Sequence, residues 1–153
     1  MSENTEMTVV ENTSLVKNMQ SFADLLMCDV TEKGYWASFP VETMEDKKAL
    51  YAAKNDNEML KNHMGEVIQL VGLVIDTQMI NDPQVGARKV PCVHLIDVDG
   101  VAYQSASSGV VNSACDIMAT FGLPETWGNE PLNVVCKETP TNSGYRYKYL
   151  AVV

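Results

Sequence analysis

Aromatic and cationic side chains alternate near the end of the chain, in the run Tyr145-Arg146-Tyr147-Lys148-Tyr149. In a strand, alternate residues point to opposite faces, so the tyrosines share one face and the cations share the other. Aromatic rings can stack on nucleobases, and cations can pair with phosphates. Either the tyrosines line the interior while the cations meet phosphate, or the tyrosines form the stacking surface. Leu150 and Val152 share the cation face, which favours the second arrangement. An ordinary solvated edge strand is the third interpretation.

Further candidates for contacts with bases or phosphates are Tyr35, Trp36, Arg88, Lys89, Tyr103 and Lys137. Arg88 and Lys89 close a predicted hairpin loop, where small barrels often hold their ligands; the alternative is two loop cations that keep the chain soluble. A tryptophan beside a strand that stops at proline is more often a core residue, and Tyr103 is equally open to both interpretations. Lys137 ends a predicted strand and is expected to point toward the terminal hairpin loop. Trp127 stands between two acidic residues, which makes it a poorer candidate.

Motifs for catalysis or cofactor binding are missing from the sequence: it has no GxGxxG, GxxxxGK[ST], nucleophile elbow or HExxH. Asp97 and Asp99 most simply flank a hairpin turn. Cys92 and His94 would face the same side of a strand, but His63 is distant and no short-spaced Cys/His cluster exists. We therefore expect no enzyme activity, no metal and no cofactor. The four cysteines are expected to be reduced and mostly buried.

The net charge of −9 disfavours phosphate binding, but the charge is unevenly distributed. Residues 1–66 carry 12 acidic and 6 basic residues, whereas residues 86–153 carry 6 acidic and 5 basic residues. A local basic groove in the second region is therefore compatible with the total. The acidic N-terminus does not resemble a signal peptide, and no apolar run approaches the ~20 residues of a membrane span. A soluble, intracellular protein is expected.

The elements that would position these residues follow a clear order after residue 65. Strands are predicted at residues 67–75, 90–98 and 101–106, a helix at 109–121, and strands at 132–137 and 145–153. A polar loop is predicted at residues 76–89, a two-residue hairpin turn at Asp99-Gly100, and a terminal turn at residues 139–144. The order strand–strand–strand–helix–strand–strand predicts a mainly β protein with some α structure, an OB-like five-stranded barrel.

Upstream of this barrel, the sequence predicts a shorter extension within the same domain. Residues 1–20 are expected to form a flexible acidic arm, and residues 21–153 a single OB-like domain, with the extension at 21–64 and the barrel at 65–153. The extension contains an apolar segment at 21–27, a short aromatic strand at 34–39, and a helix whose start is marked by Thr43 and Asp46. A further short turn ends at Gly65.

The stretches VHLIDVDGVAYQSASSGVVNSACDIMATFGLP and LNVVCKETPTNSGYRYKYLAV resemble single-stranded DNA-binding proteins of tailed bacteriophages that infect Gram-positive bacteria. The matching positions are Asp99, Gly100, Tyr103, Ser105, the helix at 109–121 and residues 144–150. The resemblance covers roughly the last 90 residues, from Gly65 onward.

This resemblance implies a non-enzymatic protein that coats displaced strands during phage DNA replication or recombination, with little sequence preference. It also implies self-association along DNA, phage or host replication and recombination proteins as partners, and the cytoplasm of the infected bacterium as the location. Unlike bacterial single-strand binders, the chain ends in a hydrophobic strand rather than an acidic tail. The alternative is a phage accessory module that uses the same barrel to bind another protein, which the excess of acidic residues favours.

Overall fold

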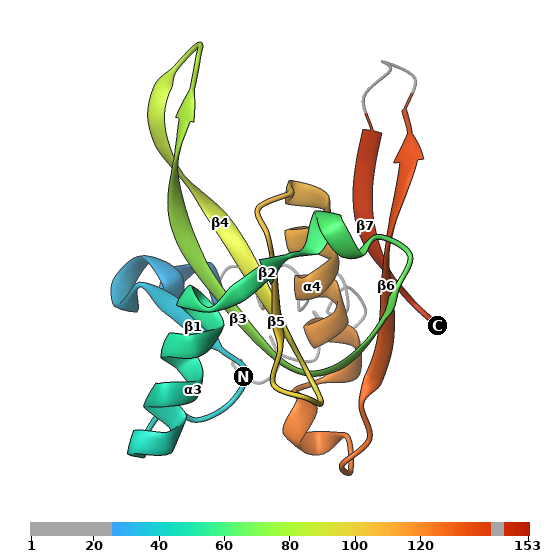
Figure 1. Cartoon of the computed structure of the whole chain (residues 1–153). Coiled ribbons are helices and arrows are strands. Elements are labelled where there is room, and N and C mark those ends of the chain that lie inside the picture. Colours follow the sequence, from blue (N-terminus) through green and yellow to red (C-terminus); the bar gives the residue numbers. More distant parts are fainter. Residues whose placement is uncertain (1–25, 142–145) are drawn as a thin grey trace, which may run out of the picture.

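In residues 26–141 and 146–153, which this computed structural model describes, seven strands form one curled sheet (Figure 1). The strands are β1 (Tyr35–Ala37), β2 (Asn57–Met59), β3 (Val67–Asp82), β4 (Gly86–Asp97), β5 (Ala102–Ser105), β6 (Leu132–Pro140) and β7 (Arg146–Val152). Their order in the sheet is β2-β5-β4-β3-β6-β7, and β1 pairs with β3. The predicted arm at 1–20 and Tyr145 lie outside the described residues.

The expected order of three strands, one helix and two strands is confirmed, and the protein is mainly β with an OB-like architecture. The long strand β3 makes the curl possible. Its first residues pair with β6, and after a register shift between Leu70 and Gly72 its remainder pairs with β4. The result is a half-barrel. The helix α4 (Ser108–Phe121) lies along β7, where the Leu150 amide donates to Ser113 Oγ at 3.2 Å.

The main core fills the concave side of this sheet. Leu73, Ile75 and Leu95 are fully buried there, and α4 contributes Val110 and Met118. Each such side chain stabilises the fold by ~1.5–3 kcal/mol relative to exposure. The expected helical pattern of apolar residues in α4 is thereby confirmed, and its predicted end is also confirmed, since Gly122 follows with φ of 80°.

The helix α3 (Met44–Asn55) covers the opposite face of the sheet, where Ala53 packs against Val74 and Ala102. The predicted helix start is confirmed as a complete capping box. Thr43 Oγ1 accepts from the Asp46 amide, and the Asp46 carboxylate accepts from the Thr43 amide, both at 3.1 Å. After α3 and β2, the 3-10 helix η2 (Leu60–His63) leads into β3, and the 3-10 helix η3 (Pro124–Thr126) follows α4.

The prediction of a polar loop at residues 76–89 is wrong. β3 and β4 instead continue as paired strands as far as Asp82 and Gly86, so that Arg88 and Lys89 belong to a strand rather than a loop. A two-stranded ribbon that projects into solvent has no buried face and therefore needs no apolar residues. For this reason its polar sequence could not be distinguished from that of a loop. Similarly, β6 continues to Pro140, three residues beyond the predicted strand end at Lys137.

Other local expectations have mixed outcomes. The turn at Asp99-Gly100 is confirmed: Asp97 Oδ1 accepts from the amides of Asp99 and Val101, each at 2.9 Å. β2 was missed, because three residues that pair in parallel with β5 carry no local signal. All four cysteines are free, with Cys92 and Cys136 buried and Cys28 exposed. No helix among the described residues is long and apolar enough to cross a membrane.

Candidate nucleic-acid interface

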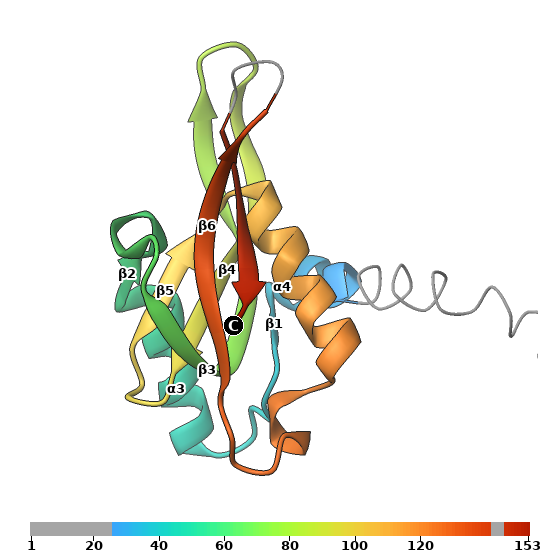
Figure 2. The same cartoon turned by 90° about the vertical axis from the view of Figure 1, so that its right-hand side faces the viewer.

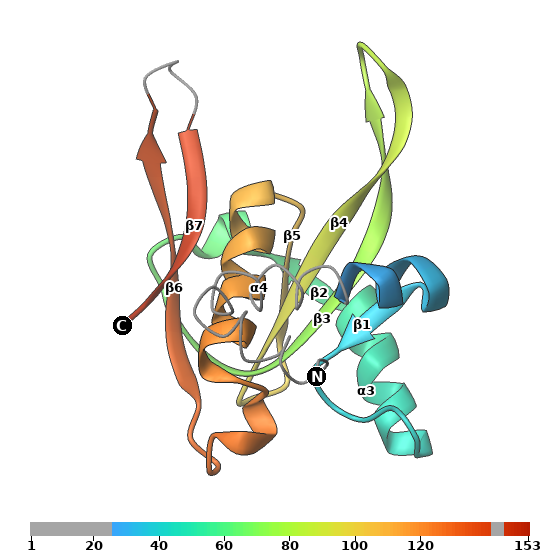
Figure 3. The same cartoon turned by 180° about the vertical axis from the view of Figure 1, so that it is seen from behind.

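Two hairpins extend from the body on the same side and flank the N-terminal end of α4 (Figures 1 and 2). One is the far part of β3 and β4, which we call the β3–β4 arm (residues 77–91). The other is the far part of β6 and β7, which we call the β6–β7 arm (residues 137–141 and 146–148). Seen from behind, the same two hairpins stand on either side of α4 (Figure 3).

Two hollows of about 370 Å³ each lie at the foot of these arms. Both are lined by Ala106 and Ser107, which connect β5 to α4, so they share a floor; together we call them the cleft. The first hollow is bounded by η2 and the β6–β7 arm, and the second by the β3–β4 arm and the first turn of α4. An extended chain could therefore run across Ala106 and Ser107 from one arm to the other.

The cleft is a cationic region of an acidic protein. Its described lining residues include the four cations Lys61, Arg88, Arg146 and Lys148, and no carboxylate. Three of them border the first hollow, and Arg88 borders the second. Phosphate groups would therefore meet positive charge on both sides of the shared floor.

Glu138 stands beside two of these cations without lining the cleft. It pairs with Arg146 Nε at 3.1 Å and with Lys148 Nζ at 3.9 Å. The register explains this contact, since Glu138 is the direct cross-strand partner of Lys148 and both side chains share one face. Glu138 therefore holds the two cations in place and would compete with any phosphate for them.

The start of α4 adds further positive potential to the floor. Ser107 is the N-cap residue, yet its side chain makes no capping hydrogen bond. The first amides of a helix carry partial positive charge and lack helical partners, so they attract anions. These amides lie at the boundary between the two hollows, among the four cations.

The tyrosines of β7 lie on the face opposite the cations. Leu150 is buried in the core on the cation face, as the alternation predicted, so Tyr147 and Tyr149 point away from the core. Their rings stack with centroids 6.1 Å apart. Tyr147 is 39% exposed, and its ring approaches Gly109 so closely that a Cβ there would come within 2.8 Å. Tyr147 thus lies beside the start of α4, next to the cleft floor.

The remaining predicted residues are distributed over the molecule. Lys89 is exposed and alternates with Arg88, so it lies on the other face of the β3–β4 arm. Lys137 is exposed and pairs with Tyr149, which places it on the tyrosine face of the β6–β7 arm. Neither residue lines the cleft.

Tyr35, Trp36 and Tyr103 lie away from the cleft or within the packing of the body. Tyr35 is half-buried on β1, with Lys54 Nζ 5.8 Å from its ring centre. Trp36 packs against the main core. Tyr103 also packs there, and its hydroxyl donates to Asp97 Oδ2 at 3.3 Å. Burial, reinforced by the Asp97 carboxylate, raises the pKa of Tyr103.

Sequence reasoning missed Lys61 and the Ala106–Ser107 floor. Lys61 belongs to η2 and reaches the first hollow only because β2 pairs with β5 and brings η2 beside the β6–β7 arm. That pairing joins residues more than 40 positions apart in the chain. No local pattern in the sequence could have indicated it.

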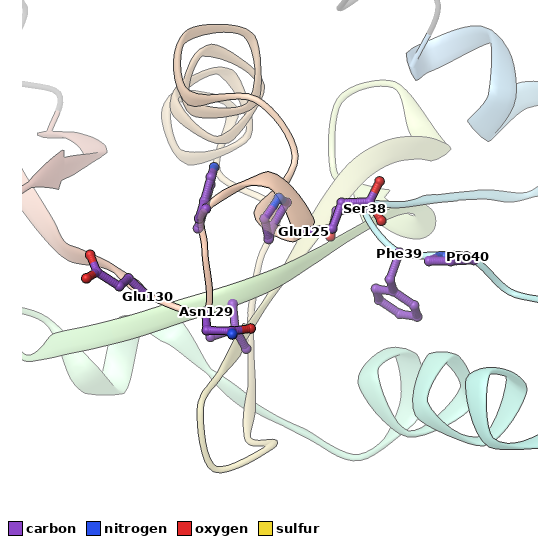
Figure 4. Close-up of a pocket in the computed structure, with 9 residues that line it drawn as sticks. Ser38, Phe39, Pro40, Glu125, Asn129 and Glu130 are labelled. Atoms are coloured by element: carbon purple, nitrogen blue, oxygen red, sulfur yellow. The ribbon is translucent and has the colours of Figure 1, made fainter.

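A third hollow, of about 400 Å³, differs in character. Figure 4 shows Ser38, Phe39 and Pro40 on one side of it and Glu125, Asn129 and Glu130 on the other. Its described lining residues include two carboxylates and no cation, so it would repel phosphate. The cleft is therefore the better candidate for binding a polyanion.

Comparison with known proteins supports the same kind of ligand. A family model described as Phage Single-stranded DNA-binding protein matches residues 29–152, which include every strand and helix named above. No match was found among curated proteins or among solved structures.

Proposed function

Because the chain belongs to the family of phage single-stranded DNA-binding proteins, we propose that it coats single-stranded DNA during phage replication or recombination, with little preference for sequence. The observation that carries the proposal is the cleft: a chain of net charge −9 places four cations and no carboxylate among the described residues around one shared floor. The role is non-enzymatic, and its location is the cytoplasm of the infected bacterium.

In this proposal the DNA backbone runs along the cleft. Lys61, Arg146 and Lys148 meet phosphates in the first hollow, and Arg88 meets them in the second. The first amides of α4 bind a phosphate between them. These contacts address the backbone alone, which accounts for a low sequence preference.

Bases would turn away from the cations toward the rim of the cleft. Tyr147 offers a partly exposed ring beside the start of α4, and a base stacked on it would gain ~1–3 kcal/mol whatever its identity. Since every base has a flat aromatic face, this contact also tolerates any sequence.

The test is a titration of a labelled oligo-dT strand, followed by fluorescence anisotropy at low salt. We expect saturable binding, similar affinity for a mixed-sequence strand and much weaker binding to duplex. Lys148→Ala and Arg88→Ala should each weaken binding several-fold. The matched control is Lys47→Ala, which removes the same charge from an exposed position on α3. Binding to duplex with equal affinity, or an equal loss in the control, would contradict the proposal.

Self-association along DNA, and contacts with phage or host replication and recombination proteins, form a second part of the proposal. Such contacts would use surfaces outside the cleft, which the bound strand occupies. Titration of long poly-dT should then show positive cooperativity that a strand long enough for one copy does not show. A strictly non-cooperative isotherm on both lengths would exclude self-association.

A further inference from the structure

A cluster of three buried side chains lies on the α3 face of the sheet, outside the cleft. Asp76 and Cys92 are direct partners across β3 and β4, and His94 is two residues from Cys92 on the same face. The exposed fraction is 6% for Asp76 and 0% for both Cys92 and His94. One ligand atom from each residue lies within 4.8 Å of the others. The sequence paired Cys92 with His94 but gave no third donor, because Asp76 fell in the loop that is in fact a strand.

We propose that Asp76, Cys92 and His94 form a binding site for one zinc ion at the base of the β3–β4 arm. Imidazole nitrogen, thiolate sulfur and carboxylate oxygen are the donors that zinc takes, at about 2.0–2.3 Å each. A softer or harder ion would fit this mixed set less well, since thioether and thiolate sets select copper(I), and all-oxygen sets select magnesium or calcium. Three protein donors leave one position of a tetrahedral shell for a water molecule.

The present contacts are compatible with a common ion. His94 Nε2 lies 2.9 Å from Asp76 Oδ1, a hydrogen-bond distance that would lengthen to about 3.3 Å, the separation of two ligands on one tetrahedral zinc ion. Asn57 Nδ2 donates to the Ala53 and Lys54 carbonyls, each at 3.1 Å, and also lies 3.4 Å from His94 Nδ1. Zinc at Nε2 would leave the ring proton on Nδ1, which faces this amide nitrogen, so Asn57 would have to move away from the ring.

The cysteine contributes the proton that binding releases. Burial, reinforced by the Asp76 carboxylate, raises the pKa of Cys92 to about 12, so the thiol is protonated at neutral pH. A zinc ion would form the Zn–S bond and displace this proton to solvent, a release of about one proton per ion.

Cobalt(II) is the probe, since it takes zinc sites and reports its ligands by absorption. The full chain in a non-thiol reductant should bind one equivalent of cobalt, with a sulfur-to-cobalt charge-transfer band and the visible bands of a tetrahedral ion. Zinc should displace both sets of bands. Zinc should also raise the thermal midpoint of the chain, because it binds the folded state.

Variants assign the ligands. Cys92→Ala should abolish the charge-transfer band, and Asp76→Asn should weaken cobalt binding at least tenfold. The matched controls are Cys136→Ala, a buried thiol outside the cluster, and His63→Gln, the other histidine with carboxylates beside it. Both should keep the band. If Cys92→Ala does not fold, two other measurements test the proposal. They are cobalt binding by Asp76→Asn and the effect of zinc on the thermal midpoint of the unmodified chain.

Three results would overturn the proposal. They are an unmodified chain without a charge-transfer band, a band that survives Cys92→Ala, and a band lost in the Cys136→Ala control. Cobalt bound only through His63 would give no sulfur band, so this result also counts against the site.

Discussion

At the scale of single residues, Glu138 determines how much of the positive charge of Arg146 and Lys148 is neutralised within the protein. This carboxylate holds Arg146 and Lys148 in place and also neutralises part of their charge. Exposed pairs of this kind contribute little to stability, about 0–1 kcal/mol, because water screens them. We expect these pairs to affect the affinity for a polyanion more than they affect stability, since a phosphate would have to displace the carboxylate or bind beside it.

Glu138→Gln should therefore tighten binding of oligo-dT by about 2- to 5-fold, the equivalent of one exposed ion pair. The amide keeps the size of the side chain and one acceptor oxygen but removes the charge. Anisotropy titrations at low salt measure the change. Glu130→Gln is the control, because it removes the same charge from the hollow of Figure 4. Equal gains in both variants would indicate an effect of net charge alone.

The contribution of His63 to the stability of the fold depends on pH. Hydrogen bonds to Glu66 at 2.9 Å and Glu58 at 2.6 Å raise the pKa of His63, with Glu66 the larger cause. A raised pKa in the folded state stabilises the protein below the ordinary histidine pKa, and this stabilisation is lost as pH rises through the folded value. The contact also orders η2, which carries Lys61.

His63→Gln should therefore lower the free energy of unfolding more at pH 5.5 than at pH 8.5. Urea midpoints of both proteins at the two pH values measure this difference. A loss that is equal at both values, or greater at pH 8.5, would show that the histidine contributes only through its packing against Tyr103.

At the scale of elements, the junction of α4 with β7 decides the shape of the cleft. Gly109 lies against the Lys148 carbonyl and the Tyr147 ring, and one turn later Ser113 Oγ accepts from the Leu150 amide. At Gly109 the helix can therefore lie this close to β7 only because the residue has no side chain. This contact fixes the β6–β7 arm relative to the cleft floor.

The substitution Gly109→Ala tests this junction, because the sign of the change in the free energy of unfolding distinguishes two effects. Helix propensity alone would make alanine more favourable by up to ~1 kcal/mol. The Cβ, however, would overlap the Lys148 carbonyl, and such overpacking costs ~1–3 kcal/mol, so we expect net destabilisation. Chemical denaturation measures it, with Ser108→Ala as the control at the exposed neighbouring position. A stabilised Gly109→Ala variant would contradict the tight contact.

At the scale of the whole molecule, charge is separated in space. The cleft gathers cations, whereas the hollow of Figure 4 carries Glu125 and Glu130 among its lining residues. An acidic protein can therefore present positive charge at the cleft and negative charge at the hollow of Figure 4, which would admit a polyanion at the first and repel it at the second. This arrangement favours one orientation of the protein on the strand.

The salt dependence of binding counts the cations that participate. Each phosphate contact on a single strand changes the slope of log K against log salt by ~0.7, so the four cations of the cleft predict a slope of about −3. Lys148→Ala should reduce its magnitude by about 0.7. Anisotropy titrations over a salt series give both values, and Lys47→Ala should leave the slope unchanged. A slope near zero would exclude phosphate as the main contact.

The order of the elements follows from local patterns in the amino-acid sequence. Runs of apolar residues with strand or helix periods, the Asp99-Gly100 turn and the Thr43–Asp46 cap are local signals, and each depends on neighbours within a few positions. The alternation of tyrosines and cations in β7 was equally local, and the burial of Leu150 agrees with it. Local hydrogen bonding and side-chain periodicity fix such features before any long-range contact forms.

Which residues meet in space depends on long-range strand pairing, which is visible in the three-dimensional structure alone. The β3–β4 arm is held by pairing between strands, so its polar residues could not be distinguished from a loop by composition. Lys61 comes to the same hollow as Lys148 and Arg146 through the parallel pairing of β2 with β5. Asp76 comes beside Cys92 and His94 through the register of β3 with β4. Both the cleft and the proposed zinc site depend on contacts between distant segments, which strand register sets and local sequence does not.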